Sequence, residues 1–287
     1  MGENVGLIVN GLSFGMLIFL LAAGLTLIFG LLRYVNLAHG SIYLLTAYVA
    51  IEVTKRSGHL LWGALAAVAL SALMGAALYL VFIRGRARLL DDPLSQVLLS
   101  FGLIAIAADV AQSQFGGLAA SLDTPSFLRG SVAVLGSRLA VYRLFLIGFG
   151  VAVAAVLLLV ERRSTFGAAV RAGVNDPGML AAIGRNPERL FLAVFVGGFT
   201  LAGIAGVVGA PFLGAAPGVE YTVLLYAVPV VVVGGLGSLA GAFGASLLVG
   251  VVDAIGKTHF PQVSLFLLFA FVVAVLAWRP TGLVRNA

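Results

Sequence analysis

Few side chains in this sequence are of the types that catalyse reactions, and they are scattered along it. The chain contains no cysteine and three histidines, His39, His59 and His259. A catalytic site needs a nucleophile beside a base, or a cluster of metal ligands, and the sequence shows neither pattern. We therefore expect no enzyme activity, no catalytic residue, no metal site and no cofactor bound by this chain.

A polar segment, VNLAHGS at residues 35–41, stands out because it lies between long apolar runs. Asn36, His39 and Ser41 fall near membrane depth, where an unpaired polar group is costly. Such groups are tolerated where a broken backbone lines a cavity or lies inside protein. We predict that Asn36, His39, Gly40 and Ser41 line a translocation pathway; for His39 the alternative is a structural histidine at a hairpin.

A glycine break is also predicted at GGLGSLAGAFG, residues 234–244, which joins two short apolar segments. Its glycines favour an interrupted helix that begins again near Ser238, and paired interrupted helices are typical of transport pathways. The alternative for Ser238 is a helix N-cap without contact to a solute. The residues predicted to line the pathway here are Gly234, Gly235, Gly237 and Ser238.

The longest polar connection, residues 161–190, contains a short helix with signals at both ends. Asp176 and Pro177 suit its first positions, Gly184 ends it, and Asn186 begins the next helix. At helical spacing this short helix would expose apolar side chains suited to a partner's groove; the alternative is an interfacial helix on lipid headgroups. The side chains expected to be exposed are Met179, Leu180 and Ile183.

Three acidic residues lie within apolar runs or at their ends, namely Glu52, Asp109 and Asp253. Carboxylates in membrane helices are typical of ion- or proton-coupled carriers, so an ion-coupled secondary transporter of small polar solutes is the alternative function. That alternative gives no reason for the capped helix within 161–190. Asp109 is accompanied by a polar stripe that could line a pathway: Gln96, Gln112 and Gln114.

Membrane helices must hold these sites, because apolar runs dominate the chain. Hydrophobic residues make up 61% of the sequence and charged residues 10%, and most charge-free runs reach the roughly 20 residues that span a bilayer core. The sequence predicts an all-α polytopic transmembrane bundle, 1–287, as a single domain that includes the connection 161–190. About nine crossings are expected, or eight to ten because 221–234 is short: 5–32, 37–53, 60–83, 94–115, 141–160, 190–213, 221–234, 239–255 and 262–278.

A short internal similarity predicts an inverted repeat. GLTL (24–27) and GFTL (198–201) fall in crossings of opposite direction, and each precedes a break, VNLAHG in one case and APFLGAAPG (210–218) in the other. Inverted repeats are common in transporter folds. The glycine-rich pattern GGFTLAGIAG (197–206) further indicates closely crossed helices, since small residues let membrane helices approach.

The basic residues predict the orientation, because cytoplasmic connections are enriched in Lys and Arg. The richer set is Arg33, Arg84, Arg86, Arg88, Arg162, Arg163, Arg171, Arg185, Arg189, Arg279 and Arg285, and the poorer set is Lys55, Arg56, Arg129, Arg138, Arg143 and Lys257. This places the N-terminus outside and the C-terminus in the cytoplasm. The net charge of +6 is spread over short connections, so the expected surroundings are a lipid bilayer, with no nucleic-acid partner.

Four motifs, in order along nearly the whole chain, resemble the branched-chain amino acid ABC-transporter permease family. They are VNLAHGS with AYVA (47–50), VRAGVNDPGMLAAIG (170–184), GGLGSLAGAFG and the tail RPTGL (279–283). The chain is most similar to the shorter of that family's two permeases. It departs from the pattern at Arg185, where an apolar residue is usual, and at Leu37, where an aromatic one is.

That resemblance implies a permease subunit of an ATP-driven importer in a cell inner membrane. Two cytoplasmic ATPase subunits, which bind ATP and Mg²⁺, would dock on it, and a second related permease would complete a heterodimeric pore. An extracytoplasmic binding protein would deliver branched-chain or related small amino acids. The chain has no GxxxxGK[ST] motif of its own. The helix within 175–186 would be the coupling helix, and the predicted ATPase-coupling residues are Asn175, Asp176, Pro177, Met179, Leu180, Ala181, Ile183 and Gly184.

Overall fold

The computed structural model describes residues 2–34, 36–84, 92–134, 136–175, 177–182 and 184–284, and this part of the chain is largely helical. Its α-helices are α1 (Gly2–Leu32), α2 (His39–Ser57), α3 (Leu60–Leu78), α5 (Pro93–Phe115), α6 (Val141–Arg163), α7 (Thr165–Asn175), α8 (Pro177–Ala182), α9 (Pro187–Gly209), α10 (Val219–Gly234), α11 (Leu239–His259) and α12 (Ser264–Trp278). A π-helical segment, Tyr79–Ile83, continues α3, and 3₁₀ turns lie at Ser126–Leu128 and Pro261–Val263. Strands β1 (Ser131–Val134) and β2 (Ser137–Ala140) form an antiparallel hairpin.

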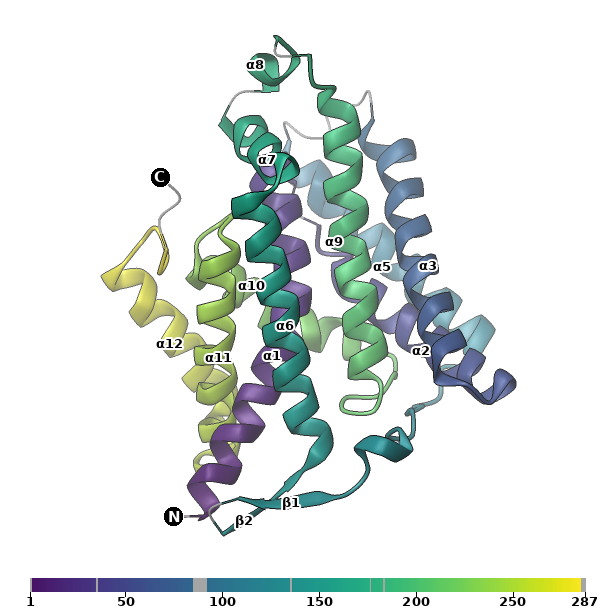
Figure 1. The fold of residues 1–287 in the computed structure, drawn as a ribbon, viewed down its shortest axis with the longest axis vertical. Coiled ribbons are helices and arrows are strands. Elements are labelled where there is room, and N and C mark those ends of the chain that lie inside the picture. The colour runs from purple at the N-terminus through teal and green to yellow at the C-terminus, as the bar shows by residue number, and fades with distance from the viewer. Residues whose placement is uncertain are drawn as a thin grey trace.

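The long helices run side by side between two ends of the bundle, which we call the α8 end and the hairpin end (Figure 1). Seven of the described helices are long and apolar enough to cross a membrane. The other two expected crossings fall on the shorter apolar helix α10 and on α2, which carries charges near its C-terminus. The predicted all-α polytopic bundle is therefore confirmed, and each predicted crossing overlaps one of these helices.

Capping residues fix several helix boundaries where the sequence suggests them. Asp92 accepts hydrogen bonds from the backbone N–H groups of Leu94 and Ser95 and begins α5. Asn186 likewise caps α9 through the N–H of Arg189, and in both helices proline takes a first-turn position. Side-chain acceptors at these positions satisfy N–H groups that have no partner within the helix.

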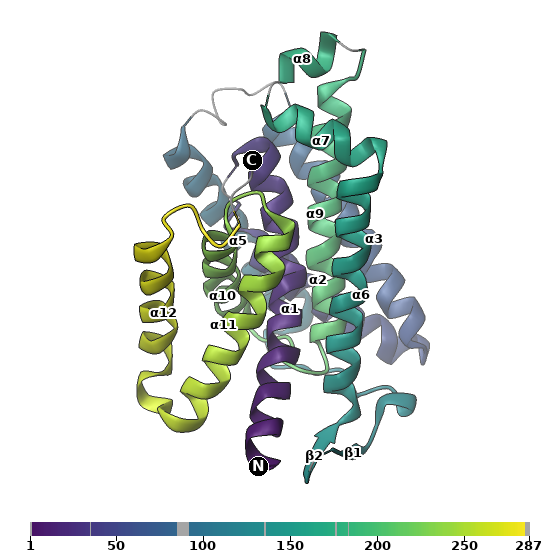
Figure 2. The same ribbon diagram turned by 60° about the vertical axis from the view of Figure 1, so that its left-hand side comes forward.

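Helix α1 forms the centre of the molecule, with α6, α9, α10 and α11 packed around it (Figures 1 and 2). Small residues allow these close crossings. A Cβ added to Gly11 would lie 2.8 Å from the carbonyl oxygen of Gly250, and one added to Gly198 would lie 2.8 Å from that of Gly24. Lipid tails are as apolar as the protein core, so apolar side chains gain little by moving from lipid into the bundle. Close packing of the helix backbones therefore contributes to the association of membrane helices.

The contacts follow a two-fold pattern that supports the predicted inverted repeat. The first half of the repeat is α1, α2, α3 and α5, and its counterparts, in the same order, are α9, α10, α11 and α12. The contact of α1 with α11 matches that of α9 with α3. The contact of α2 with α5 likewise matches that of α10 with α12. Helices α6, α7 and α8 lie between the two halves in sequence. The GLTL and GFTL segments meet at the Gly24–Gly198 crossing, about two turns before the end of α1 and near the middle of α9.

Three features differ from the sequence expectations. The hairpin of β1 and β2 was not predicted, because its strands are only four residues long. Helix α7 was also not predicted; its amphipathic sequence lies within the polar connection at residues 161–190. Finally, α9 ends at Gly209 rather than 213, so the Pro-bearing segment that follows is longer than expected.

Candidate functional site

The first break lies between the end of α1 and the start of α2, and α2 begins inside the bundle. His39, the first residue of α2, lies beside Gly24, well inside α1, and its ring packs edge-on against Phe199 with ring centroids 5.8 Å apart. Non-helical backbone therefore lies within the depth of the bundle, as the sequence predicts. Such backbone is stable in a membrane only inside protein or along a cavity.

The polar side chains of this break are buried and unpaired. Asn36, His39 and Ser41 are at most 2% exposed, and the amide atoms of Asn36 and the hydroxyl of Ser41 have no hydrogen-bond partner in the described structure. The carbonyl of Leu21 lies by the His39 ring, but neither ring nitrogen makes a hydrogen bond of normal geometry. Each such group costs about 1–3 kcal/mol, so their presence calls for a functional explanation.

Helix α5 holds this break from one side through a narrow buried stripe. The hydroxyl of Ser100 accepts a hydrogen bond from the backbone N–H of Leu37 (3.2 Å) and donates one to the carbonyl of Gln96 (2.8 Å). The sequence suggested a single polar stripe on this helix, and that was wrong. Gln96 is buried, whereas Asp109 and Gln112 are exposed on other faces, because a helix turns about 100° per residue.

A second break, residues 210–218 before α10, meets the first. The carbonyl of Glu220, at the start of α10, lies against Gly40 at the start of α2, and the Tyr43 hydroxyl donates to the carbonyl of Gly214 (3.3 Å). The N-termini of two helices that run in opposite directions thus meet inside the bundle. Helix N-termini carry partial positive charge, which favours an acidic group beside them.

Glu220 is a residue of this junction that sequence reasoning missed. It is 3% exposed, and its Oε2 accepts a hydrogen bond from the backbone N–H of Gly218 (2.8 Å). Its carboxylate offsets the positive N-terminus of α10. The signal in the sequence was a lone acid between two long apolar runs, just after a glycine.

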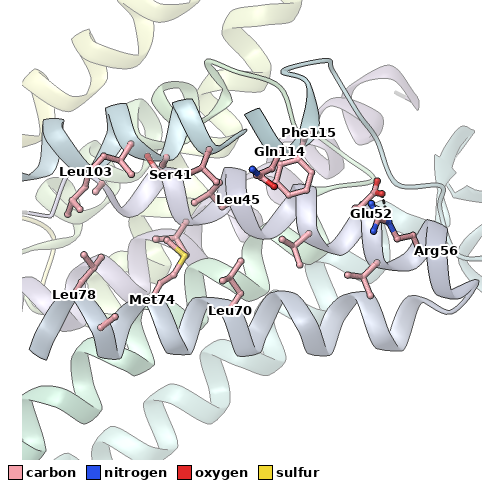
Figure 3. A pocket seen from close by; sticks show the side chains of 18 residues that line it. Ser41, Leu45, Glu52, Arg56, Leu70, Met74, Leu78, Leu103, Gln114 and Phe115 are labelled. Atoms are coloured by element: carbon pink, nitrogen blue, oxygen red, sulfur yellow. Dashed lines mark hydrogen bonds and ion pairs between the residues drawn. The ribbon is translucent and has the colours of Figure 1, made fainter. Parts of the chain in front are cut away.

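Two apolar cavities flank α5 beside this junction. A cavity of about 590 Å³ lies between α2, α3 and α5; Figure 3 shows Ser41 and Leu45 along one wall, Met74 on the facing helix, and the Glu52–Arg56 ion pair farther along α2. A second cavity, of about 480 Å³, lies on the other side of α5, against α10 and α12, and includes Leu37. Both volumes fall in the range of small-molecule sites, roughly 300–1,000 Å³.

On the hairpin side, the segment that follows α5 covers the second break. Ala120 and Ala215 exchange two backbone hydrogen bonds of 2.8 Å, and the hydroxyl of Tyr48 donates to the carbonyl of Leu118 (2.9 Å). This short bridge ties residues 116–122 to residues 210–215. The sequence did not predict this contact between the two segments.

The predicted glycine break, residues 234–238, lies at the other end of α10. Ser238 caps α11 by accepting a hydrogen bond from the N–H of Gly241 (3.1 Å), so the interrupted helix begins where expected. Some 14 residues of α10 separate Gly234 from Glu220, which is about 21 Å of helix. The two segments predicted to line one pathway therefore lie at opposite ends of α10.

The chain's tail packs onto this glycine break. The backbone N–H groups of Leu283 and Val284 donate to the carbonyls of Val233 and Gly234 at 2.8 and 3.3 Å. A Cβ on Gly282 would lie 2.6 Å from the Cα of Gly235, and both glycines have positive φ. The tail motif RPTGL is thus explained as a cap on the last carbonyls of α10, which have no partner within the helix.

At the α8 end, the predicted coupling segment forms two helices. Asn175 ends α7, and Pro177 and Met179 lie in α8; Asp176 and Ile183 lie outside the described residues. Gly184 ends the segment with φ 77°, and its N–H bonds to the carbonyl of Ala181.

The expectation that Leu180 is exposed was wrong. It is fully buried with Leu31, Leu190 and Val194, because α8 must anchor one apolar side chain to stay on the bundle. Ala181 and Gly184 are exposed and available to a partner.

The acidic residues of the carrier alternative have ordinary structural surroundings. Asp253 is buried and accepts a hydrogen bond from the Tyr226 hydroxyl (2.7 Å) while pairing with Lys257 (2.8 Å). Glu52 pairs with Arg56 (2.6 Å) on the surface. Within the described residues, no three histidine or acidic side chains lie close enough to hold a metal ion.

Comparison with known proteins decides the family. The sequence pattern described as "Branched-chain amino acid transport system / permease component" matches residues 7–277. The chain belongs to this permease family. It is a transmembrane transport protein of the ABC permease type, and nearly its whole length carries the match.

Two curated relatives show how far this similarity extends. The high-affinity branched-chain amino acid transport system permease protein BraD of Pseudomonas aeruginosa is 28% identical over 296 residues, covering 96% of this chain and 94% of that protein. The permease protein LivH of Escherichia coli K12 is 26% identical over 298 residues, covering 96% and 93%. A solved structure, PsaBC from Streptococcus pneumoniae in complex with Fab, covers 93% of this chain and 90% of its own at 14% identity, with a TM-score of 0.46.

Proposed function

We propose that this permease forms the translocation pathway of an ATP-driven importer of branched-chain amino acids in a cell inner membrane. The observation that carries the proposal is the junction of α2 and α10, where two helix N-termini meet among unpaired polar side chains beside apolar cavities. The relatives are described as permeases of high-affinity branched-chain amino acid transport systems, and the same class of solute is proposed for this chain.

The chemistry of the junction suits an amino acid with an apolar side chain. The solute's carboxylate would be drawn to the N-terminus of α2, because the carboxylate of Glu220 already offsets the N-terminus of α10. Asn36, His39 and Ser41 offer donors and acceptors that lack partners in the described structure. The aliphatic side chain would occupy the apolar cavities beside α5. Weak, distributed contacts of this kind let a solute pass, and selectivity would reside in an extracytoplasmic binding protein.

The energy would come from partner subunits at the α8 end. Two ATPases would contact α8 through Ala181 and Gly184, which are exposed, and a second related permease would complete the pore. Because α8 is anchored through Leu180 to α1 and α9, movement of α8 is transmitted to the helices that cross at Gly24 and Gly198. Alternating access would follow from rocking one half of the inverted repeat against the other.

The test is ATP-driven uptake of leucine by proteoliposomes that contain the assembled transporter, with Asn36→Leu as the variant. Replacing an unpaired buried amide by an apolar side chain of similar size leaves stability unchanged or raises it, while the pathway loses a polar contact and uptake falls. The control is Thr54→Val, which removes another unpaired hydroxyl on α2 far from the junction. Normal uptake by Asn36→Leu, or uptake that needs an ion gradient and no ATP, would refute the proposal.

A further inference from the structure

A third cavity lies at the α8 end, between α7, the segment after α8 and the start of α9. Its volume is about 400 Å³, within the range of small-molecule sites. It is separate from the two cavities beside α5. Its lining includes Thr165, Phe166, Ala169, Arg185, Arg189 and Ala193.

The mouth of this cavity is positively charged. Arg185 and Arg189 both line it and are exposed, and no ion pair of either is found among the described residues. The neighbouring acid, Glu188, instead pairs with Arg84 at 3.4 Å. The capped N-terminus of α9 opens at the same place and adds partial positive charge. Two guanidinium groups beside such a terminus are suited to a phosphate group.

Part of the cavity's lining is apolar and belongs to α7 and to the membrane helix α9. Ala193 lies about one helical turn beyond Arg189 along α9, a helix that crosses the membrane, and it is exposed. Phe166 on α7 is 40% exposed, and Ala169 lies one turn farther along that helix. A ligand here would therefore place a phosphate at the end of the bundle and an apolar part along the outer surface of α9.

We propose that this cavity binds an anionic glycerophospholipid, with its phosphate held by Arg185 and Arg189 and an acyl chain against Ala193, Phe166 and Ala169. Basic pockets beside membrane helices are the sites that recognise anionic headgroups. A free phosphate would satisfy the arginines but not the apolar wall, which is why a lipid fits the whole cavity. The bound lipid would fill the space between α7 and α9, which together hold α8.

The test measures lipid bound to the purified full-length chain by native mass spectrometry and its effect on thermal unfolding. The probes are phosphatidylglycerol, phosphatidylcholine with the same acyl chains, and inorganic phosphate. We expect phosphatidylglycerol alone to be retained and to raise the unfolding temperature. The double variant Arg185→Gln/Arg189→Gln should bind phosphatidylglycerol roughly 10- to 30-fold more weakly, because this is the affinity that two basic side chains contribute at an anionic membrane surface.

Two further variants separate this site from general attraction to the surface. Arg162→Gln/Arg163→Gln removes the same charge from exposed residues at the same end, outside the cavity, and should bind as the parent protein does. Ala193→Phe keeps both arginines but fills the apolar wall, and should weaken lipid binding without changing net charge.

Three results would overturn the proposal. Equal losses in the two arginine variants would show only nonspecific attraction of anionic lipid. Equal stabilisation by inorganic phosphate would indicate a site for a soluble anion. Undiminished lipid binding by Arg185→Gln/Arg189→Gln, with lost binding of an ATPase subunit, would assign the arginines to a protein contact.

Discussion

Buried polar side chains in this bundle are either paired or unpaired, and the unpaired ones at the junction are the candidates for function. Asp253 is buried but has both a hydroxyl donor, Tyr226, and a cation, Lys257. Asn36, His39 and Ser41 are equally buried and have no such partners. Paired groups recover the cost of leaving water, whereas unpaired ones do not. We therefore assign Asp253 to stability and propose the other three as pathway residues.

Substituting Asp253 tests that distinction. Asp253→Ala leaves the Tyr226 hydroxyl buried without its acceptor and Lys257 without its counter-ion, and should lower the free energy of unfolding by about 1–3 kcal/mol. Asp253→Asn keeps an acceptor for Tyr226 and should cost less. Thermal unfolding in detergent measures both. Leucine uptake by Asp253→Asn should persist, since this carboxylate relays no proton; its complete loss in a stably folded variant would favour the carrier alternative.

The crossing of α1 and α9 depends on two glycines. A Cβ on Gly24 would meet the carbonyl oxygen of Gly198, so Gly24→Ala should force the helices apart and destabilise the bundle by about 1–3 kcal/mol. Gly148 on α6 has open space around its Cα, and Gly148→Ala should be neutral or slightly stabilising. Unfolding temperatures of the two variants give the comparison, and equal values would mean that the crossing is not tightly packed.

Helices and their connections show where sequence reasoning succeeds. Helix positions were predictable because apolar run length and capping residues such as Ser238 and Asn186 are local signals. The two breaks were also predictable from Gly, Pro and polar residues at membrane depth. That α2 and α10 meet at Gly40 and Glu220, or that residues 116–122 cover the second break, could not be predicted, since both depend on contacts between distant segments.

The coupling segment shows the same limit. The sequence predicted a short capped helix, and α8 is found at Pro177–Ala182. The sequence could not show which side of so short a helix faces the bundle, and Leu180 is buried. Its partners Leu31, Leu190 and Val194 come from two other helices, so no local pattern identifies them.

The tail is expected to stabilise the α10–α11 break. Truncation after Arg279 removes the hydrogen bonds that Leu283 and Val284 make to the end of α10. At about 1 kcal/mol each, their loss should lower the unfolding temperature and increase proteolysis near the glycine break. Truncation after Val284 keeps both bonds and is the matched control. Identical stability of the two truncated proteins would contradict this role.

The whole molecule is asymmetric between its two ends, and the distribution of arginines predicts that the α8 end is cytoplasmic. Because the chain has no cysteine, single cysteines report orientation without background. A membrane-impermeant maleimide should label Ala133→Cys, exposed in the hairpin, in intact spheroplasts, and should label Ala181→Cys only after the membrane is opened. The reverse labelling pattern would show that the α8 end is not cytoplasmic, and a cytoplasmic ATPase could then not contact α8.

Docking of the ATPases on α8 is the claim on which the proposed importer rests. The measurement is co-purification of the candidate ATPase subunits with the permease, comparing Ala181→Glu in α8 with Ala133→Glu in the hairpin, both substitutions of exposed alanines. We expect Ala181→Glu to lose the ATPase while keeping its unfolding temperature, and Ala133→Glu to retain it. If both variants bind the ATPase as the parent protein does, α8 is not the coupling helix.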